Sequence, residues 1–295
     1  RRIGLGVPIE FGARLSGSLN KKWRIGAMDM QTKSMDATGL PAQNFAVLAL
    51  QRRVFSRSNI RFMFVNKQAL NYDPAQHPGK PVYNAFNRNI GLEYNLASTN
   101  NLWTGKSMFV KSFGPVKNSD DLVHAANLQY SSKKWLLSWQ HEYVGENYTA
   151  EVGYVPRINY VKLNPKLSYQ FFPKGGNILS HGPILSSTLY YNKSFSQTDN
   201  ETSFNYKFTH RNQSTFEVWT SDNFIRLLRP FDPLNTGKGN LSTGTEHLWN
   251  TWGANYFSKP QKLYTYSFSG QYGGYFADGT RLNLSAALGY RFQPY

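Results

Sequence analysis

The chain has 295 residues, and its 33 Lys and Arg against 17 Asp and Glu give a formal net charge of +16. It contains no cysteine, which excludes disulfide frameworks, thiolate metal sites and a cysteine nucleophile. The longest apolar run, residues 45–50, is far shorter than the ~20 residues of a membrane-spanning helix, so an α-helical membrane protein is excluded. A membrane β-barrel is not excluded, because only alternate residues of its strands meet lipid.

Strand patterns begin close to the N-terminus. The first residues contain no initiating Met and no apolar signal segment, so we expect the sequence to begin inside a longer or processed protein. From residue 9 onward, apolar and polar residues alternate with a period of two, which is typical of β-strands with two different faces. Fifteen strands are predicted, at 9–19, 23–33, 44–54, 58–68, 83–96, 102–112, 122–132, 135–145, 160–172, 184–196, 202–211, 214–227, 247–258, 263–274 and 281–292. Strands 44–54 and 102–112 mix the two faces, and Pro165 predicts a bulge or strained pairing in strand 160–172.

The connections between these strands alternate between short turns and longer loops. This alternation is typical of outer-membrane barrels, whose turns are periplasmic and whose loops are external. We therefore predict an all-β fold, a transmembrane antiparallel up-and-down β-barrel that forms a single domain over residues 1–295. Such barrels have an even number of strands. An upstream strand outside this chain would make 16, which we prefer, whereas one broken segment read as two would leave 14.

The last predicted strand, 281–292, has the cleanest alternation of the chain. Its apolar face is predicted to meet lipid and carries Leu282, Leu284, Leu288, Tyr290 and Phe292. The two aromatic rings come last, where a membrane interface favours them. Bacterial outer-membrane barrels commonly end in such a strand, although residues 293–295 follow the aromatic position here.

Four stretches, residues 1–4, 8–17, 44–54 and 151–157, together resemble an outer-membrane barrel family of the Bacteroidota type. The most specific of them are the early motif and the segment Glu-Val-Gly-Tyr-Val-Pro-Arg at 151–157. In that family the barrel usually follows a periplasmic domain similar to family-9 carbohydrate-binding modules, which this sequence does not include. The resemblance implies no agreed activity, so no catalytic residue is carried over from it.

Charged residues on the polar strand faces are predicted to line the lumen. They are Glu10, Arg14, Arg24, Arg61, Lys162, Lys166, Lys207, Arg281 and Arg291. Rings of Arg and Lys favour anions, which suggests an anion-selective channel. The interpretation we favour is a plugged or collapsed lumen, in which these charges pair with Glu10, Glu142 and Glu217 or bind water.

The basic balance points to a membrane rather than to nucleic acid. Nucleic-acid binding needs exposed aromatic residues within a basic stripe, but here the aromatic residues fall on the apolar strand faces. Basic pairs such as Lys21-Lys22 and Arg52-Arg53 lie at predicted short turns, where anionic lipid head groups would attract them. We expect outer-membrane lipid and lipopolysaccharide as partners, together with other outer-membrane or periplasmic proteins.

No residue pattern predicts catalysis or metal binding. The six His residues lack metal-ligand spacing. Acidic groups such as Asp120-Asp121 and Asp199-Asn200-Glu201 lack the spacing of a calcium loop and read as solvated turns. We therefore expect no enzyme activity, no cofactor and no metal.

The predicted loop 228–246 and the residues just before it are unusually apolar. The residues concerned are Phe224, Ile225, Leu227, Leu228 and Phe231. An exposed apolar segment favours a lid over the lumen or a surface for a partner protein. The alternative is a long strand that ends in a packed loop.

Three functions follow as hypotheses. The preferred one is an outer-membrane barrel that serves as a structural or accessory subunit of a larger cell-envelope complex. The second is an outer-membrane channel for anionic or glycan-derived solutes, and a weaker third is a barrel-embedded hydrolase. A soluble sugar-binding β-protein is the alternative to any membrane barrel.

Overall fold

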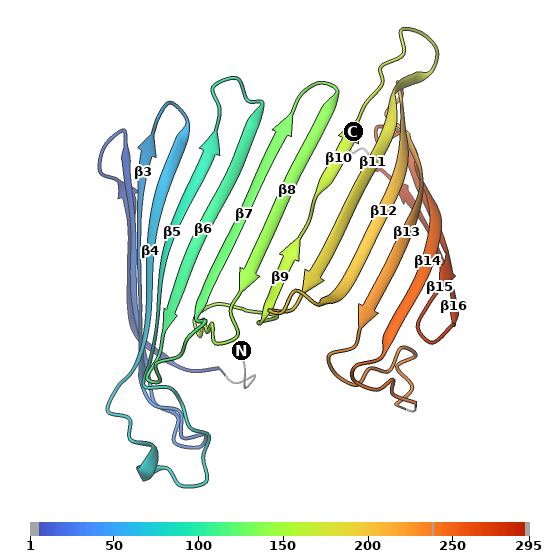
Figure 1. Cartoon of the computed structure of the whole chain (residues 1–295). Coiled ribbons are helices and arrows are strands. Elements are labelled where there is room, and N and C mark those ends of the chain that lie inside the picture. Colours follow the sequence, from blue (N-terminus) through green and yellow to red (C-terminus); the bar gives the residue numbers. More distant parts are fainter. Residues whose placement is uncertain (1–5, 238, 293–295) are drawn as a thin grey trace. The chain divides into compact units, whose positions relative to one another are not determined.

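The computed structural model describes residues 6–237 and 239–292. The fold is all-β, and sixteen antiparallel strands form one meander sheet that follows chain order (Figure 1). Within these residues, none of the helical structure is long and apolar enough to cross a membrane; it consists of the short 3-10 helix η1 (Pro74–Gln76). The predicted all-β class and antiparallel meander are therefore confirmed.

The observed strand boundaries agree with most of the predicted ones to within about three residues. The strands are β1 (Ile9–Ser18), β2 (Trp23–Thr32), β3 (Gln43–Val54), β4 (Ser58–Ala69), β5 (Phe86–Ala97), β6 (Trp103–Phe113), β7 (Leu122–Ser131), β8 (Trp135–Val144), β9 (Tyr160–Leu163), β10 (Lys166–Tyr169), β11 (Ile178–Tyr191), β12 (Gln197–His210), β13 (Thr215–Arg226), β14 (Glu246–Phe257), β15 (Tyr264–Gly274) and β16 (Thr280–Tyr290).

Strands β9 and β10 are two pieces of one strand position between β8 and β11, interrupted at Pro165. The pairing register with β11 is the same on both sides of the interruption. Pro165 has no N–H to donate to the carbonyl oxygen of Ser187, and the side-chain amide of Asn164 donates to that oxygen instead, at 2.7 Å. The sixteen strands therefore occupy fifteen positions across the sheet, and the even count comes from this interruption.

The prediction was wrong for the turn between β11 and β12. That turn is formed by residues 192–196, and not by 197–201. The side-chain oxygen of Asn192 accepts hydrogen bonds from the backbone N–H groups of Ser194 and Ser196, which closes a tight turn at this point. Residues 199–201 consequently lie inside β12 and do not form a solvated turn.

The chain divides into two compact units. Unit 1 contains residues 1–127 and 142–160, and unit 2 contains residues 128–141 and 161–295. The strand ladders of the described residues do not include a pair that closes the sheet into a barrel. Because residues directly opposite each other in a ladder share one face of the sheet, the ladders identify two faces in each unit.

In unit 1, the ladders place Arg14, Arg24 and Arg61 on one face, which we call the Arg61 face. The opposite face, which we call the Leu92 face, carries large apolar side chains that remain accessible, among them Leu92 at 56% exposure. The register of β1 shifts at Glu10, so the ladder does not assign that residue to a face.

In unit 2, Lys166, Lys207 and Arg281 share one face, which we call the Lys207 face. The opposite face, which we call the Leu284 face, is apolar and exposed. It includes the residues predicted to meet lipid that lie in β16, and their exposed fractions run from 50% for Tyr290 to 79% for Leu288. Arg291 and Phe292 lie beyond the end of β16.

Candidate functional site

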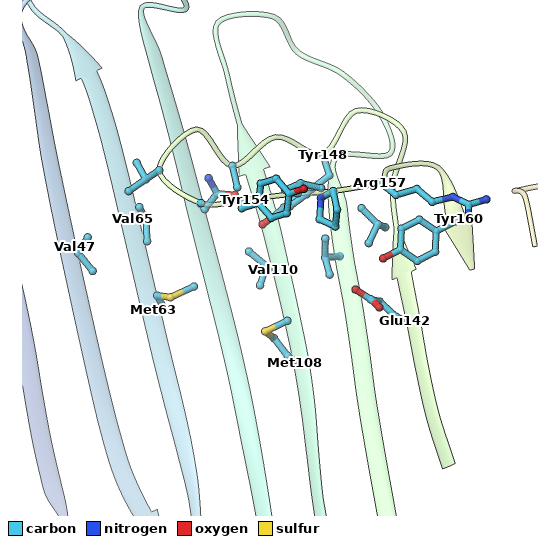
Figure 2. Close-up of a pocket in the computed structure, with 18 residues that line it drawn as sticks. Val47, Met63, Val65, Met108, Val110, Glu142, Tyr148, Tyr154, Arg157 and Tyr160 are labelled. Atoms are coloured by element: carbon cyan, nitrogen blue, oxygen red, sulfur yellow. The ribbon is translucent and has the colours of Figure 1, made fainter. Parts of the chain in front are cut away.

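The connection between β8 and β9, residues 145–159, folds back over the Arg61 face of unit 1 (Figure 2). We call it the folded-in segment. At its start, the N–H of Gly145 donates to the carbonyl oxygen of Leu122 at 2.9 Å. A Cβ atom at position 145 would lie 2.2 Å from the carbonyl oxygen of Asp120, so only glycine fits there. The N–H groups of Glu146 and Asn147 donate to Asp120 and direct the chain onto the sheet.

A buried ion pair holds the middle of the folded-in segment. Oε2 of Glu151 lies 2.6 Å from Nζ of Lys67 in β4, and the Lys67 side chain is only 4% exposed. The other carboxylate oxygen of Glu151 accepts a hydrogen bond from the Asn84 amide, and Lys67 also donates to the Asn84 carbonyl oxygen. The lysine charge is thereby neutralised and hydrogen-bonded where it is buried, which is the condition for its stability there.

A chain of amide hydrogen bonds runs beside the ion pair. The Asn87 side chain in β5 donates to the hydroxyl of Thr149 at 3.0 Å and accepts the N–H of Glu151 at 3.1 Å. The Asn89 amide nitrogen donates to the Asn87 side-chain oxygen at 2.9 Å. In addition, the Ser112 hydroxyl of β6 accepts the N–H of Thr149. Two neighbouring strands, β5 and β6, thus fix the backbone of residues 149–151.

Between the folded-in segment and the sheet lies a cavity of about 380 Å³, within the size range of small-molecule sites. Its lining comes entirely from unit 1. The sheet contributes mostly aliphatic and thioether side chains, from Val47, Met63, Val65, Met108, Val110, Val123 and Val144. Figure 2 shows Tyr148, Tyr154 and Arg157 of the segment above these strands. Burial raises the pKa of the Tyr148 phenol, which is therefore neutral at physiological pH.

The amide, carboxylate and guanidinium groups in this lining belong to Asn89, Glu142 and Arg157. Such a cavity is suited to binding an apolar molecule and fixing its orientation at a few polar points. In residues 6–237 and 239–292 we find no cluster of three or more potential metal-ligating side chains.

The charged residues predicted for unit 1 are only partly brought together. Arg61 pairs with Glu93 at 3.2 Å, and Lys106 pairs with the other carboxylate oxygen of Glu93 at 2.6 Å. Sequence analysis named neither Glu93 nor Lys106. Glu142, expected to neutralise lumen charges, lines the cavity, as does Arg157. The cluster around Glu93 follows from which residues lie opposite each other on neighbouring strands. That pairing register cannot be read from the alternation of apolar and polar residues alone.

In unit 2, the predicted basic residues are spread over several strands, and Lys207 lies opposite Glu217 in the ladder between β12 and β13. Lys162 lies 5.5 Å from the ring of Tyr190, and Arg281 lies 5.1 Å from the ring of Tyr275. Arg291 donates to the carbonyl oxygen of Pro260.

The apolar segment before and within the predicted loop 228–246 is divided between a strand and a packed loop. Phe224 and Ile225 belong to β13, in agreement with the predicted strand 214–227. Leu227 is buried, Leu228 is exposed, and the ring of Phe231 lies 5.0 Å from that of Phe276. Residues 231 and 241 form an isolated antiparallel bridge, so this part of the loop is a small hairpin.

Asp232 holds the tip of this hairpin. Desolvation raises the pKa of its carboxyl group, but hydrogen bonds from several backbone N–H groups, led by that of Gly237, outweigh this effect and hold the pKa below its usual value. Its carboxylate accepts the N–H groups of Leu234 at 3.0 Å and Gly237 at 2.7 Å. The charged form of Asp232 therefore stabilises the folded loop.

No protein-family model, no curated protein and no solved structure matches this chain. The residues of the candidate site that sequence analysis missed are Lys67, Asn87 and Asn89, whereas Glu151 was named only as the first residue of the segment 151–157. One signal was available, since Lys67 follows Met63 and Val65 on one face of an alternating strand. A lysine at the end of an apolar row indicates a charged partner from elsewhere in the chain.

Proposed function

We propose that this chain is an outer-membrane β-barrel protein. The observation that carries the proposal is the exposed apolar face of each unit, opposite a face that holds the basic residues. On the Leu284 face, Phe268, Trp252 and Leu284 are each at least half exposed. Burying such side chains in lipid is favoured by roughly 25 cal/mol per Å² of apolar surface, and alternation of this kind is the pattern of strands that span a bilayer.

Closure of the barrel is part of this proposal. The fifteen strand positions alternate in direction, so the first and last strands run the same way along the sheet. A closed barrel then requires either a parallel pair between β1 and β16 or one more antiparallel strand between them. In a barrel closed with the apolar faces outward, the Arg61 face and the Lys207 face line the interior.

We propose further that the barrel acts as a structural or accessory subunit of a larger cell-envelope complex. The folded-in segment supports this role over that of an open pore, because an ion pair and several hydrogen bonds fix it on the face that would line the lumen. Outer-membrane lipid, lipopolysaccharide and other envelope proteins are the partners that this role implies.

A channel for anionic solutes is the second candidate. It is favoured by the position of Arg14, Arg24 and Arg61 on one face, since aligned basic groups select anions. Conductance of the purified protein in planar bilayers separates the two roles. A stable, anion-selective conductance would favour the channel, whereas the absence of conductance would favour the subunit.

The membrane orientation is tested by a matched pair of substitutions in β16. Leu284→Arg places a charge on the exposed apolar face, at an expected cost of about 2–4 kcal/mol near the bilayer midplane. Ser285→Arg places the same charge on the opposite face. We expect the first variant to fail in membrane assembly, measured by heat-modifiable mobility in outer-membrane fractions, and the second to assemble. Equal assembly of both variants would refute the orientation.

The subunit role is tested by purifying the tagged protein from native outer membranes in mild detergent. We expect one or more envelope proteins to co-purify at a fixed stoichiometry, determined by mass spectrometry. A barrel that purifies alone from gently solubilised membranes would contradict the subunit role while leaving the membrane-barrel proposal intact.

A further inference from the structure

We propose that the cavity beneath the folded-in segment binds a small neutral amphiphile, with an apolar body and one hydroxyl or amide N–H group that donates a hydrogen bond to Asn89. All residues that carry this inference lie in unit 1, and it requires neither barrel closure nor the proposed cellular role.

The walls of the cavity select the apolar body. The floor is formed by side chains from β3, β4 and β6, including Val47, Val65, Met63 and Val110, and Val110 is 3% exposed. The roof adds Val152, Val155 and Pro156 from the segment. Desolvation in these apolar walls would oppose binding of a strongly polar ligand. The two charged side chains of the lining, Glu142 and Arg157, have opposite signs and give the cavity no net charge.

Asn89 selects the hydrogen-bond donor. Its side chain is 4% exposed and lines the cavity. The orientation of its amide is set by the neighbouring network, because the Asn87 amide donates to Thr149 and so leaves its own oxygen to accept from the Asn89 nitrogen. The Asn89 oxygen is thereby left as a buried acceptor without a hydrogen-bond partner in the protein.

A buried acceptor of this kind is destabilising until a donor reaches it. A single water would need two to four polar partners to be held. The ladder neighbours of Asn89 are Val65 in β4, which provides none, and Ser112 in β6, whose hydroxyl is already engaged, since it donates to the Asp121 carbonyl oxygen and accepts the N–H of Thr149. A hydroxyl group at the end of an apolar chain satisfies the acceptor and fills the apolar volume together.

The cavity is also held open. The buried pair between Lys67 and Glu151, the Asn87 hydrogen bonds and the close approach at Gly145 fix the roof at separate points. Collapse of the roof onto the floor would break these contacts, so the volume persists without a ligand and is available to one.

The test uses methionine methyl groups as reporters in the whole chain held in amphipol. The chain has five Met residues, of which Met63 and Met108 line the cavity, while Met35 lies in the connection after β2 and serves as the reference. Methionine-methyl NMR is recorded during titration with 1-decanol, and separately with decane, which lacks the hydroxyl group.

We expect decanol to shift the Met63 and Met108 signals saturably and to leave that of Met35 unchanged. Decanol is expected to bind about 5-fold or more tightly than decane, corrected for partition into amphipol, because only decanol satisfies the buried acceptor. Asn89→Leu, which removes the acceptor, should abolish the preference, and Val110→Phe, which fills the cavity, should weaken both ligands.

Two results on the unmodified chain would overturn the proposal without any variant. One is the absence of saturable shifts at Met63 and Met108, and the other is equal affinity for decanol and decane. Retention of the full preference in folded Asn89→Leu would also overturn it. Equal assembly of the two β16 variants would count against the proposed function alone and would leave these outcomes unaffected.

Discussion

The ion pair between Lys67 and Glu151 allows the strongest prediction about the folded-in segment. The side chains are 4% and 18% exposed, so solvent screens the pair weakly. Glu151→Gln keeps the shape of the side chain but removes its charge, and leaves the buried Lys67 ammonium with neutral acceptors such as the Asn84 carbonyl oxygen and without a counter-charge. Breaking one side of such a pair typically costs about 3–5 kcal/mol. The lower figure corresponds to a roughly 100-fold more frequent opening of the segment.

Hydrogen-exchange mass spectrometry of a peptide covering residues 146–158 measures this opening. We expect exchange to be about 100-fold faster in Glu151→Gln. The double variant with Lys67→Met should recover most of the protection, since it removes the uncompensated charge. Unchanged exchange in the single variant, or no recovery in the double variant, would refute the view that this ion pair holds the segment.

Three further predictions concern single positions. Gly145→Ala should destabilise the protein by about 1–3 kcal/mol because its methyl group would meet a backbone oxygen, whereas Gly114→Ala, with open space around it, should melt like the parent in detergent. Because the folded protein lowers the pKa of Asp232, the stabilising effect of its charge is complete above the usual pKa of 3.8 and is lost as the pH falls through the lower folded-state pKa. NMR signals of the surrounding loop should therefore broaden on acidification. In the control variant Asp232→Asn, the same signals should not change with pH. Phe231→Ala should remove a ring contact with Phe276 that is worth about 0.5–1.5 kcal/mol beyond its buried area, and proteolysis within the loop should quicken while the strands remain resistant.

Local pattern predicted most of this fold because strand formation follows a period of two along the chain. The strand at 281–292 shows the strength of this signal, since the polar and apolar faces expected from its residues are the faces that the ladder assigns. The turn between β11 and β12 shows its weakness. The turn at 192–196 is set by hydrogen bonds of the Asn192 side chain, and the predicted position missed it by several residues.

By itself, the sequence determined most of the strand ranges and the alternation of turns and loops, and it located irregular pairing at Pro165, because each depends on residues close together in the chain. The structure shows that irregularity as a break between β9 and β10 with no change of register and not as a bulge. The tertiary structure alone decided the candidate site. Strands 44–54 and 102–112 carry apolar residues on both faces because the folded-in segment covers the face that would otherwise be polar. The ion-pair partners Lys67 and Glu151 are 84 residues apart in the chain. Alternation reports that two faces differ, whereas a distant segment that packs on a face is specified only by contacts in three dimensions.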